Sequence, residues 1–344
     1  MTLFGQFQFL SFEELQLLLL VHLKLEVLNL SLAFLLNLPK PLKEKATIGL
    51  ICPGGGFDDY KPIKLVVKYL QRLNYKVKLG SSLISSTKFP KYLSGLDNKR
   101  KNEFVDFWND NNVDAIFCLK GGYGCLRLLE DLNFNLLERK RKILLGFSDV
   151  TILLLALYKK CNLMTFHGPL IGRNFIKNNL KSYDSPTEEK MWKLLKSPDF
   201  KFSYSFKSQA KIINPGKAIG RLLGGNFTSI CSLLGTEYLP DFKNTILFLE
   251  DCNEEPYRID RMLTQLKNAG IFKKVSGIVF GTFHKCAFKS NKEIASLIKD
   301  RVESKKIPIL FNAPIGHGKK NYILPVGQRV ILDVSNANLS SEVG

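Results

Sequence analysis

The sequence contains few residues that could hold a metal ion. It has only four histidines, and none of them stands at ligand spacing from another histidine or from a cysteine. No Cys-x-x-Cys pair occurs either. We therefore expect no metal site.

The cysteines also lack the pattern of a disulfide framework. They are odd in number, widely spaced and mostly set among apolar residues: Cys52, Cys118, Cys125, Cys161, Cys231, Cys252 and Cys286. Such cysteines are typical of buried, reduced thiols. The pattern predicts a cytoplasmic protein.

No apolar run is long enough to cross a membrane. Residues 15–38 are rich in leucine, but His22, Lys24 and Glu26 interrupt them, and a spanning helix needs roughly 18–20 apolar residues. A secretory signal is also missing, because acidic residues precede the apolar part and no basic start or small-residue cleavage site is present. We expect residues 1–44 to be an extension outside the catalytic fold, without membrane contact. An amphipathic helix, an interfacial anchor and a mis-assigned start codon stay open as its nature.

Features of nucleic-acid binding are absent in spite of a formal net charge of +19. The lysines are scattered along the chain, and no arginine-rich tract or aromatic RNA-binding motif occurs. We therefore expect no nucleic-acid partner. A positive field that attracts a carboxylate-rich small substrate fits this charge. The 344 residues, 45% of them hydrophobic, are enough for two globular domains.

Alternating strand and helix patterns fill the first half. Apolar strands are expected at 46–52, 76–79 and 113–119, and helices at 63–73, 99–111 and 126–132. This alternation predicts a parallel sheet with right-handed crossovers. The glycines that follow Pro53 lack both the dinucleotide-binding spacing and a Walker lysine, so they indicate a tight turn rather than a phosphate cradle.

The stretch Ile143-Leu-Leu-Gly-Phe-Ser-Asp-Val-Thr151 leads from an apolar strand into a helical pattern. A sharp bend there lifts the Ser148 hydroxyl clear of the sheet, as a nucleophile requires, and the free N–H of Asp149 can bind an oxyanion. Alternatively, Ser148 or Asp149 simply caps the helix that follows.

A second glycine-rich turn, Lys120-Gly-Gly-Tyr-Gly-Cys125, follows the strand at 113–119. The carboxyl ends of parallel strands meet at one edge of the sheet, so this turn is expected near Ser148. Gly121 and Gly122 allow backbone N–H groups to approach a substrate oxygen closely. The alternative is that these glycines only close a tight loop.

The pattern loosens after His167-Gly-Pro169, and His167 is interpreted as a structural histidine. Residues 171–215, with one helical segment near 187–195, are interpreted as the connection between a first domain (45–170) and a second one (216–340).

Two further candidates stand in the second domain. The strand at 245–251 delivers Glu250 to its end, where a carboxylate can orient an imidazole, although a salt bridge to Arg258 or Arg261 serves equally well. His317 lies between two glycines in a loop, which suits a general base. Lone loop histidines are more often plain surface residues.

Taken together and in order, several motifs resemble the LD-carboxypeptidase family of serine peptidases. They are Gly-Gly-Tyr-Gly at 121–124, Gly-Phe-Ser-Asp-Val-Thr at 146–151, His-Gly-Pro at 167–169, Gly-Gly-Asn at 224–226, Leu-Glu-Asp at 249–251, Pro-Tyr-Arg-Ile-Asp-Arg at 256–261 and Gly-His-Gly at 316–318. The resemblance covers about residues 45–335.

The resemblance implies a Ser-Glu-His triad at Ser148, Glu250 and His317. It also implies an α/β fold with a flavodoxin-like parallel-sheet N-terminal domain, a mixed α/β C-terminal domain rich in β-structure, an active site between them and a homodimer. The expected reaction is acyl transfer without any cofactor, with the oxyanion held by the N–H groups of Asp149 and Gly122.

The expected substrate is a small murein peptide, from which the enzyme removes the terminal D-alanine at an L,D bond during cell-wall recycling. The alternatives are a microcin C-type peptide-nucleotide amidase that confers self-immunity and a non-catalytic muropeptide-binding protein. Lys120, Gly121 and Tyr123 are the candidate substrate-binding residues, with Lys120 directed at the terminal carboxylate.

Two residues depart from the family pattern. The family usually has an arginine where Lys120 stands, and lysine keeps the charge but loses the bidentate fork. It usually has a serine after the proline of the first turn, where Gly54 stands here. Both positions bear on substrate fit rather than on the triad.

Overall fold

The computed structural model describes residues 36–85, 90–169, 185–302 and 307–342. The leucine-rich part of the N-terminal extension and much of the predicted connection lie outside these ranges. Residues 37–344 form one compact unit that contains two β-sheets. This unit begins at Asn37, which bridges to Leu163, and the Leu42 N–H donates to the Leu195 carbonyl.

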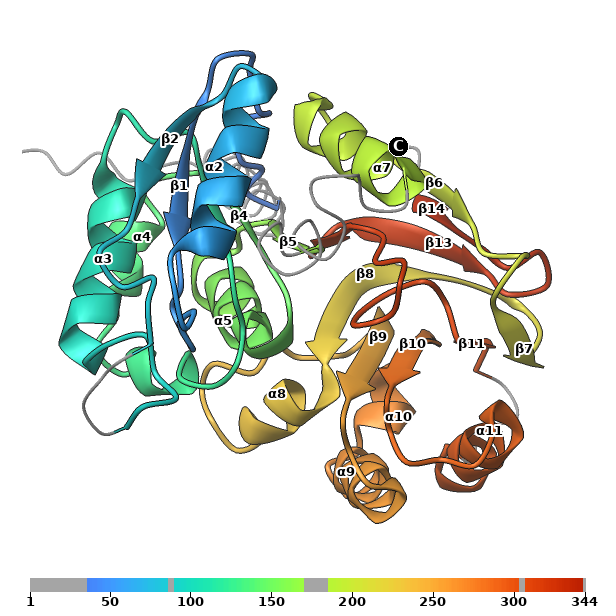
Figure 1. The fold of residues 1–344 in the computed structure, drawn as a ribbon. Coiled ribbons are helices and arrows are strands. Elements are labelled where there is room, and N and C mark those ends of the chain that lie inside the picture. The colour runs from blue at the N-terminus through green and yellow to red at the C-terminus, as the bar shows by residue number, and fades with distance from the viewer. Residues whose placement is uncertain (1–35, 86–89, 170–184, 303–306, 343–344) are drawn as a thin grey trace, which may run out of the picture. The chain divides into compact units, whose positions relative to one another are not determined.

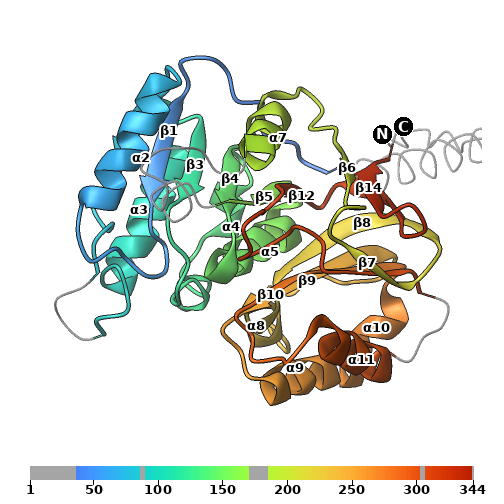
Figure 2. The same ribbon diagram turned by 45° about the vertical axis from the view of Figure 1, so that its right-hand side comes forward.

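The first sheet has the strand order of flavodoxin-like folds. In Figure 1 the strands β2 and β1 lie side by side in this sheet. Five parallel strands follow the order β2-β1-β3-β4-β5, and β12 adds an antiparallel edge next to β5 (Figure 2). The strands are β1 (Thr47–Ile51), β2 (Lys76–Leu79), β3 (Ala115–Cys118), β4 (Ile143–Gly146), β5 (Thr165–His167) and β12 (Leu324–Val326). Apart from β2, they are almost entirely buried, as a sheet covered on both faces requires. The predicted parallel sheet is confirmed.

Helices cover this sheet. They are α2 (Lys61–Arg72), α3 (Asp97–Asn109), α4 (Phe134–Leu137), α5 (Thr151–Cys161) and α7 (Ser185–Lys196). Trp192 of α7 packs against Tyr69 of α2 and stacks on Tyr75, whereas α3, α4 and α5 contact one another in series (Figure 2). The apolar period of α2 places Ile63, Val66 and Leu70 in the core, as its pattern predicts.

The second sheet is mixed and has eight strands in the order β6-β14-β13-β8-β9-β10-β11-β7. Its strands are β6 (Ser203–Ser205), β7 (Lys211–Asn214), β8 (Lys217–Asn226), β9 (Thr245–Cys252), β10 (Gly277–His284), β11 (Ile309–Phe311), β13 (Arg329–Asp333) and β14 (Asn338–Ser341). The helices of this half are α8 (Phe227–Ser232), α9 (Pro256–Asn268), α10 (Ile271–Lys274) and α11 (Asn291–Arg301). The predicted β-rich mixed α/β half is thus confirmed.

Two details of the prediction differ from the structure. The helix expected at 126–132 is only a short 3-10 turn, η1 (Leu126–Leu128), because a new helix starts soon after, where the Asn133 side chain caps α4. The segment 171–215 is more than a connection, since α7, β6 and β7 belong to it. Alternating aromatic residues explain this, because Phe202, Tyr204 and Phe206 are all buried.

The two sheets meet at the start of α5. The Asn226 N–H at the end of β8 donates to the Thr151 hydroxyl at 3.0 Å, and Ser229 of α8 donates to the Ser148 carbonyl at 3.4 Å. A side chain at Gly225 would collide with Thr151, so glycine is required at this approach. The second half thereby docks directly on the strand-to-helix bend after β4.

Candidate active site

Ser148 stands at a strained bend between β4 and α5. Its φ of 62° lies in the left-handed region, which non-glycine residues rarely adopt, and such strain is found at nucleophile elbows. Its flanking residues Phe147 and Asp149 are buried, while Ser148 itself is partly exposed. The short 3-10 turn η2 (Ser148–Val150) then leads into α5. The predicted sharp bend is present.

Capping does not explain these residues. The side chain of Ser148 makes no capping hydrogen bond to the helix, and the Asp149 carboxylate instead accepts from the Cys125 N–H at 2.9 Å. Burial raises the pKa of Asp149, and the hydrogen bonds from Cys125 partly offset this effect. Asp149 thus ties the elbow to the second glycine-rich turn.

The Gly121–Gly124 turn lies directly against the serine. A Cβ atom placed on Gly121 would stand 2.7 Å from Ser148 Cβ, 2.9 Å from Ser148 Oγ and 3.3 Å from the Asp149 nitrogen. The N–H groups of Asp149 and Gly122 donate to no other residue of the described chain. Two backbone donors are therefore free beside the serine, as an oxyanion site requires.

Arg100 holds the two glycine-rich turns together. It is fully buried on α3, and its guanidinium donates to the carbonyls of Pro53 and Gly124 as well as to that of Gly95. Asp97 completes its hydrogen bonds. The planar guanidinium, with its five N–H donors, thus holds together the loops that follow β1 and β3. Its position inside a helix of ordinary charged composition gave no signal of this role in the sequence.

The candidate substrate-binding residues divide into two kinds. Lys120 donates to the Gly56 carbonyl, and its ammonium lies 5.5 Å from the centre of the Phe57 ring, so it serves to fix the first turn. Tyr123, by contrast, is 46% exposed and packs edge-on against exposed Tyr92, with 5.8 Å between the ring centres. Tyr123 is thereby available to a bound molecule.

The departure at Gly54 has a steric reason in this chain. A Cβ atom there would lie 2.6 Å from the Gly121 carbonyl oxygen and 2.7 Å from the Asp149 carboxylate. Serine therefore does not fit without a shift of the Gly121 turn or of Asp149. The Gly55 N–H also donates to the Gly121 carbonyl at 2.7 Å, so the two turns are in direct contact.

Glu250 and His317 form a buried pair. The distance from His317 Nδ1 to Glu250 Oε2 is 2.7 Å, Glu250 is fully buried, and the His317 side chain is 2% exposed. The alternative salt bridges of Glu250 do not form, since Arg258 pairs with Glu254 instead. The structure thus brings together two residues that are 67 positions apart in the sequence.

The contact between Glu250 and His317 changes the pKa of both residues. Burial alone lowers the pKa of His317, but the charge of Glu250 and the hydrogen bonds to Cys252 and Glu250 outweigh it, so the pKa is raised above 6.5. Burial alone raises the pKa of Glu250, but the charge and the hydrogen bond of His317, together with the nearby His167, outweigh it, so the pKa is lowered. Each residue therefore stabilises the charged form of the other.

Small residues shape the loop that carries His317. A Cβ atom on Gly316 would lie 2.2 Å from Glu250 Oε2, and the Gly316 N–H donates to buried Asn321 at 2.8 Å. Thr282 accepts from the Gly318 N–H and donates to the Ile315 carbonyl, which ties both sides of the loop to β10. The sequence marked the Gly-His-Gly pattern but gave no sign of Thr282 or Asn321.

Phe147 connects the pair to the elbow. Its ring lies 4.6 Å from the His317 ring, centre to centre, and Ser148 is the next residue. No hydrogen bond joins Ser148 Oγ to His317 within the described chain. Catalytic hydrogen bonds are often long or poorly aligned before the substrate binds.

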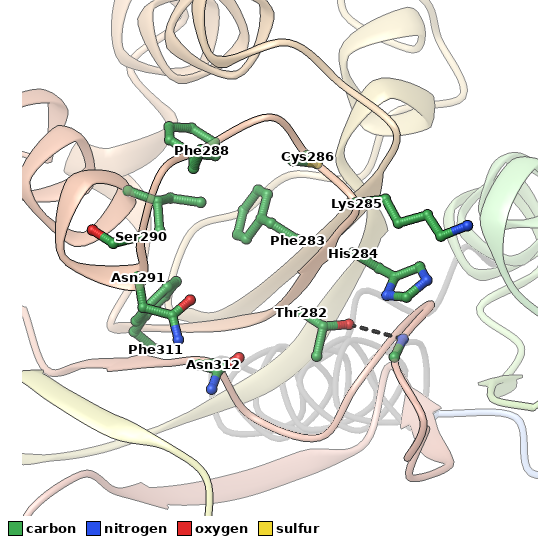
Figure 3. A pocket seen from close by; sticks show the side chains of 12 residues that line it. Thr282, Phe283, His284, Lys285, Cys286, Phe288, Ser290, Asn291, Phe311 and Asn312 are labelled. Carbon is green, nitrogen blue, oxygen red and sulfur yellow. Dashed lines mark hydrogen bonds between the residues drawn. The ribbon is translucent and has the colours of Figure 1, made fainter.

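A cavity of about 300 Å³ lies on the other side of the His317 loop. Figure 3 shows Phe283 in the middle of the view, Phe288 above it, and His284 and Lys285 to its right. Thr282 and Gly318, which are joined by a hydrogen bond, also line the cavity. None of the predicted triad residues lines it. The structure therefore separates this cavity from the candidate catalytic pair by the loop itself.

Comparison with known proteins agrees with this geometry. Residues 48–168 match the LD-carboxypeptidase N-terminal domain, and residues 219–332 match the LD-carboxypeptidase C-terminal domain. The probable murein peptide carboxypeptidase of Bacillus subtilis is 32% identical over 309 residues, which cover 89% of this chain and 94% of that protein. The chain belongs to the LD-carboxypeptidase family.

Other members of the LD-carboxypeptidase family have solved structures. The muramoyltetrapeptide carboxypeptidase of Oxalobacter formigenes superposes with a TM-score of 0.72 at 28% identity, over 86% of this chain and 97% of that one. The microcin C7 self-immunity protein MccF of Escherichia coli is 29% identical over 304 residues, 80% of this chain and 86% of that protein. A structure of MccF in complex with aspartyl sulfamoyl adenosine superposes with a TM-score of 0.80 at 25% identity, over 89% and 98% of the two chains.

The described residues contain neither a metal-binding cluster nor a helix that could span a membrane. No cluster of three or more metal-binding side chains occurs among them. None of the helices in this part of the chain has the length and apolar character of a membrane span. All seven cysteines are unpaired, and four of them are buried.

The contact between Gly121 and Ser148 gives a prediction. Gly121→Ala is expected to lower kcat/KM by about 100-fold or more. The added methyl group would lie 2.7 Å from Ser148 Cβ, so it must push the serine out of its position. The measurement is hydrolysis of a peptide substrate at fixed enzyme concentration. Gly95→Ala is the matched control, since a Cβ there meets only ordinary contacts from 3.5 Å. Equal activities of both variants would contradict the placement of Ser148.

Proposed function

We propose that this protein is a serine carboxypeptidase that hydrolyses an L,D peptide bond and releases terminal D-alanine from murein tetrapeptides. The observation that carries the proposal is the buried Glu250–His317 pair packed, through Phe147, against the strained elbow at Ser148. The murein peptide and muramoyltetrapeptide carboxypeptidases among its relatives support the choice of substrate.

The first half of the reaction forms an acyl-enzyme. Ser148 Oγ attacks the carbonyl carbon of the penultimate residue while His317 Nε2 takes the hydroxyl proton, and Glu250 stabilises the imidazolium through Nδ1. The N–H groups of Asp149 and Gly122 hold the oxyanion. The C–N bond then breaks, and His317 gives its proton to the departing amine, which leaves as the free D-amino acid.

The second half restores the enzyme. His317 takes a proton from water, the hydroxide oxygen attacks the ester carbon, and the same two N–H groups hold the second oxyanion. The C–O bond to Ser148 breaks, and the serine oxygen receives the proton from His317. No metal or organic cofactor takes part.

Further parts of the proposal follow from the family resemblance. We propose two domains, at 45–170 and 216–340, a homodimer and a cytoplasmic site of action in cell-wall recycling. The net charge of +19 fits a substrate that carries several carboxylates. Lys120 is engaged with Gly56, so we propose that it releases this carbonyl when it binds the terminal carboxylate.

A second candidate function is hydrolysis of peptide nucleotides, as in self-immunity proteins of the MccF type. The observation that favours it is the exposed pair of Tyr92 and Tyr123 next to the glycine turns, because exposed aromatic rings stack on nucleobases. The complex of MccF with aspartyl sulfamoyl adenosine supports this candidate too.

Labelling with a fluorophosphonate probe tests the serine chemistry independently of the substrate. The probe reacts with serines that a neighbouring base has activated, so the wild-type protein is expected to be labelled and both Ser148→Ala and His317→Ala are expected to remain unlabelled. Labelling that persists in Ser148→Ala would show that another residue is the nucleophile. A folded wild-type protein without any labelling would favour a muropeptide-binding role.

A further inference from the structure

Glu250 has a second buried histidine beside it. Its Oε2 contacts His317, while its Oε1 has no hydrogen-bond partner within the described chain. The Nε2 atom of His167 lies 3.8 Å from this Oε1, and both side chains are fully buried. The carboxylate is therefore flanked by one imidazole on each oxygen.

The remaining surroundings of His167 are aromatic. The ring packs edge-on against Phe147 at 5.8 Å and against Phe248 at 5.1 Å, centre to centre. Neither ring nitrogen has a hydrogen-bond partner within the described chain. A buried polar group without a hydrogen-bond partner lowers the stability of the fold, and an unpaired oxygen of a buried carboxylate lowers it further. Glu250 is the group that the structure offers to His167.

The position of His167 links the two sheets. It ends β5 and pairs in register with Gly146, the last residue of β4, two residues before Ser148. Glu250 stands on β9 of the second sheet. A contact between them therefore joins β5, the neighbour of the strand that leads to the serine, to the strand that carries the acid.

We propose that His167 is a positioning residue that donates its Nε2–H to Glu250 Oε1 and so keeps Oε2 directed at His317. This inference rests on the proposed function of the Ser148, Glu250 and His317 triad. A movement of about 1 Å converts the 3.8 Å contact into a hydrogen bond. With both oxygens bound, the carboxylate cannot rotate when His317 becomes an imidazolium during acylation.

Two substitutions test this role. His167→Gln keeps an N–H donor near the place of Nε2, whereas His167→Met fills a similar volume without a donor. We expect His167→Met to lower kcat by about tenfold to 100-fold with KM unchanged, and His167→Gln to stay within a few-fold of the wild type. Tm of both variants is measured first, so that activities are compared only for folded protein.

The outcomes separate packing from positioning. Rescue by glutamine supports the proposal, because a ring that only fills space would be replaced better by apolar methionine than by a buried amide. Equal or higher kcat for His167→Met than for His167→Gln would overturn it. A wild-type protein without hydrolysis or probe labelling would instead refute the proposed function, so the two failures are distinguishable.

Discussion

Ser148→Ala is expected to lower kcat by a factor of about 10⁴ to 10⁶ while the protein stays folded. The loss is large because the proposed covalent route needs the Ser148 oxygen, and the remaining contacts only bind and polarise the substrate. Stability is expected to change little, since Ser148 is partly exposed at a turn and its hydroxyl has no hydrogen bond to another described residue. Alanine has the same difficulty with the φ of 62° as serine, so the strain is unchanged.

Rates of amino-acid release and thermal melting of the variant and wild type measure this prediction. Ser232→Ala is the matched control, because its hydroxyl donates within α8 to the Ser229 carbonyl and takes no part in the proposed chemistry. The control is expected to retain wild-type kcat. A Ser148→Ala variant with more than a few per cent of wild-type activity would refute the serine mechanism.

Glu250→Gln is expected to lower kcat by about 10⁴-fold, because the amide can no longer stabilise the imidazolium of His317 and can select its wrong tautomer. The pH profile is expected to change as well. The general base must be neutral, and Glu250 raises the pKa of His317, so the acid limb of kcat/KM in the wild type lies above pH 6.5. Without the carboxylate, burial lowers this pKa, and the limb moves to lower pH.

The same pair makes stability depend on pH. The pKa of His317 is raised on folding, so its contribution is complete below about pH 6.5 and is lost as the pH rises through the folded value. The pKa of Glu250 is lowered, so its contribution is complete above about pH 4.5 and is lost on acidification. Glu250→Gln is therefore expected to lower Tm most between about pH 4.5 and 6.5.

Kinetic profiles and melting curves from pH 4 to 10 check both statements, with Glu237→Gln as the control, an exposed glutamate paired with Lys160 on the surface. If the acid limb of the kcat/KM profile of Glu250→Gln stays in place or moves to higher pH, the assigned role of the carboxylate is contradicted.

The sequence predicted the elements whose periods are long and regular. The strand at 76–79 agrees with β2 at both ends, and α2 and α3 lie within two residues of their predicted bounds, because apolar residues recur there at the spacing of one buried face. It did not predict β6, β7 or the edge strand β12. These are short strands of three or four residues that pair with distant strands, and only β6 has a local signal, the alternation of Phe202, Tyr204 and Phe206.

Three candidate catalytic residues were also predicted, because each stands at the end of a strand or in a glycine-flanked loop. The structure places Glu250 against His317 and packs both next to the Ser148 elbow. It shows Lys120 bound to the Gly56 carbonyl, and it places the buried His167 beside Glu250. These contacts join residues from different halves of the chain, and spacing along the sequence contains no information about them.

The most direct test of the account is release of free alanine from a murein tetrapeptide, compared with its L-alanine-terminated diastereomer and with a peptide nucleotide. The account predicts release from the D-alanine peptide alone, and loss of that release in Ser148→Ala. Hydrolysis of the peptide nucleotide, with both murein peptides intact and the protein labelled by the fluorophosphonate probe, would contradict the murein assignment and establish the amidase instead.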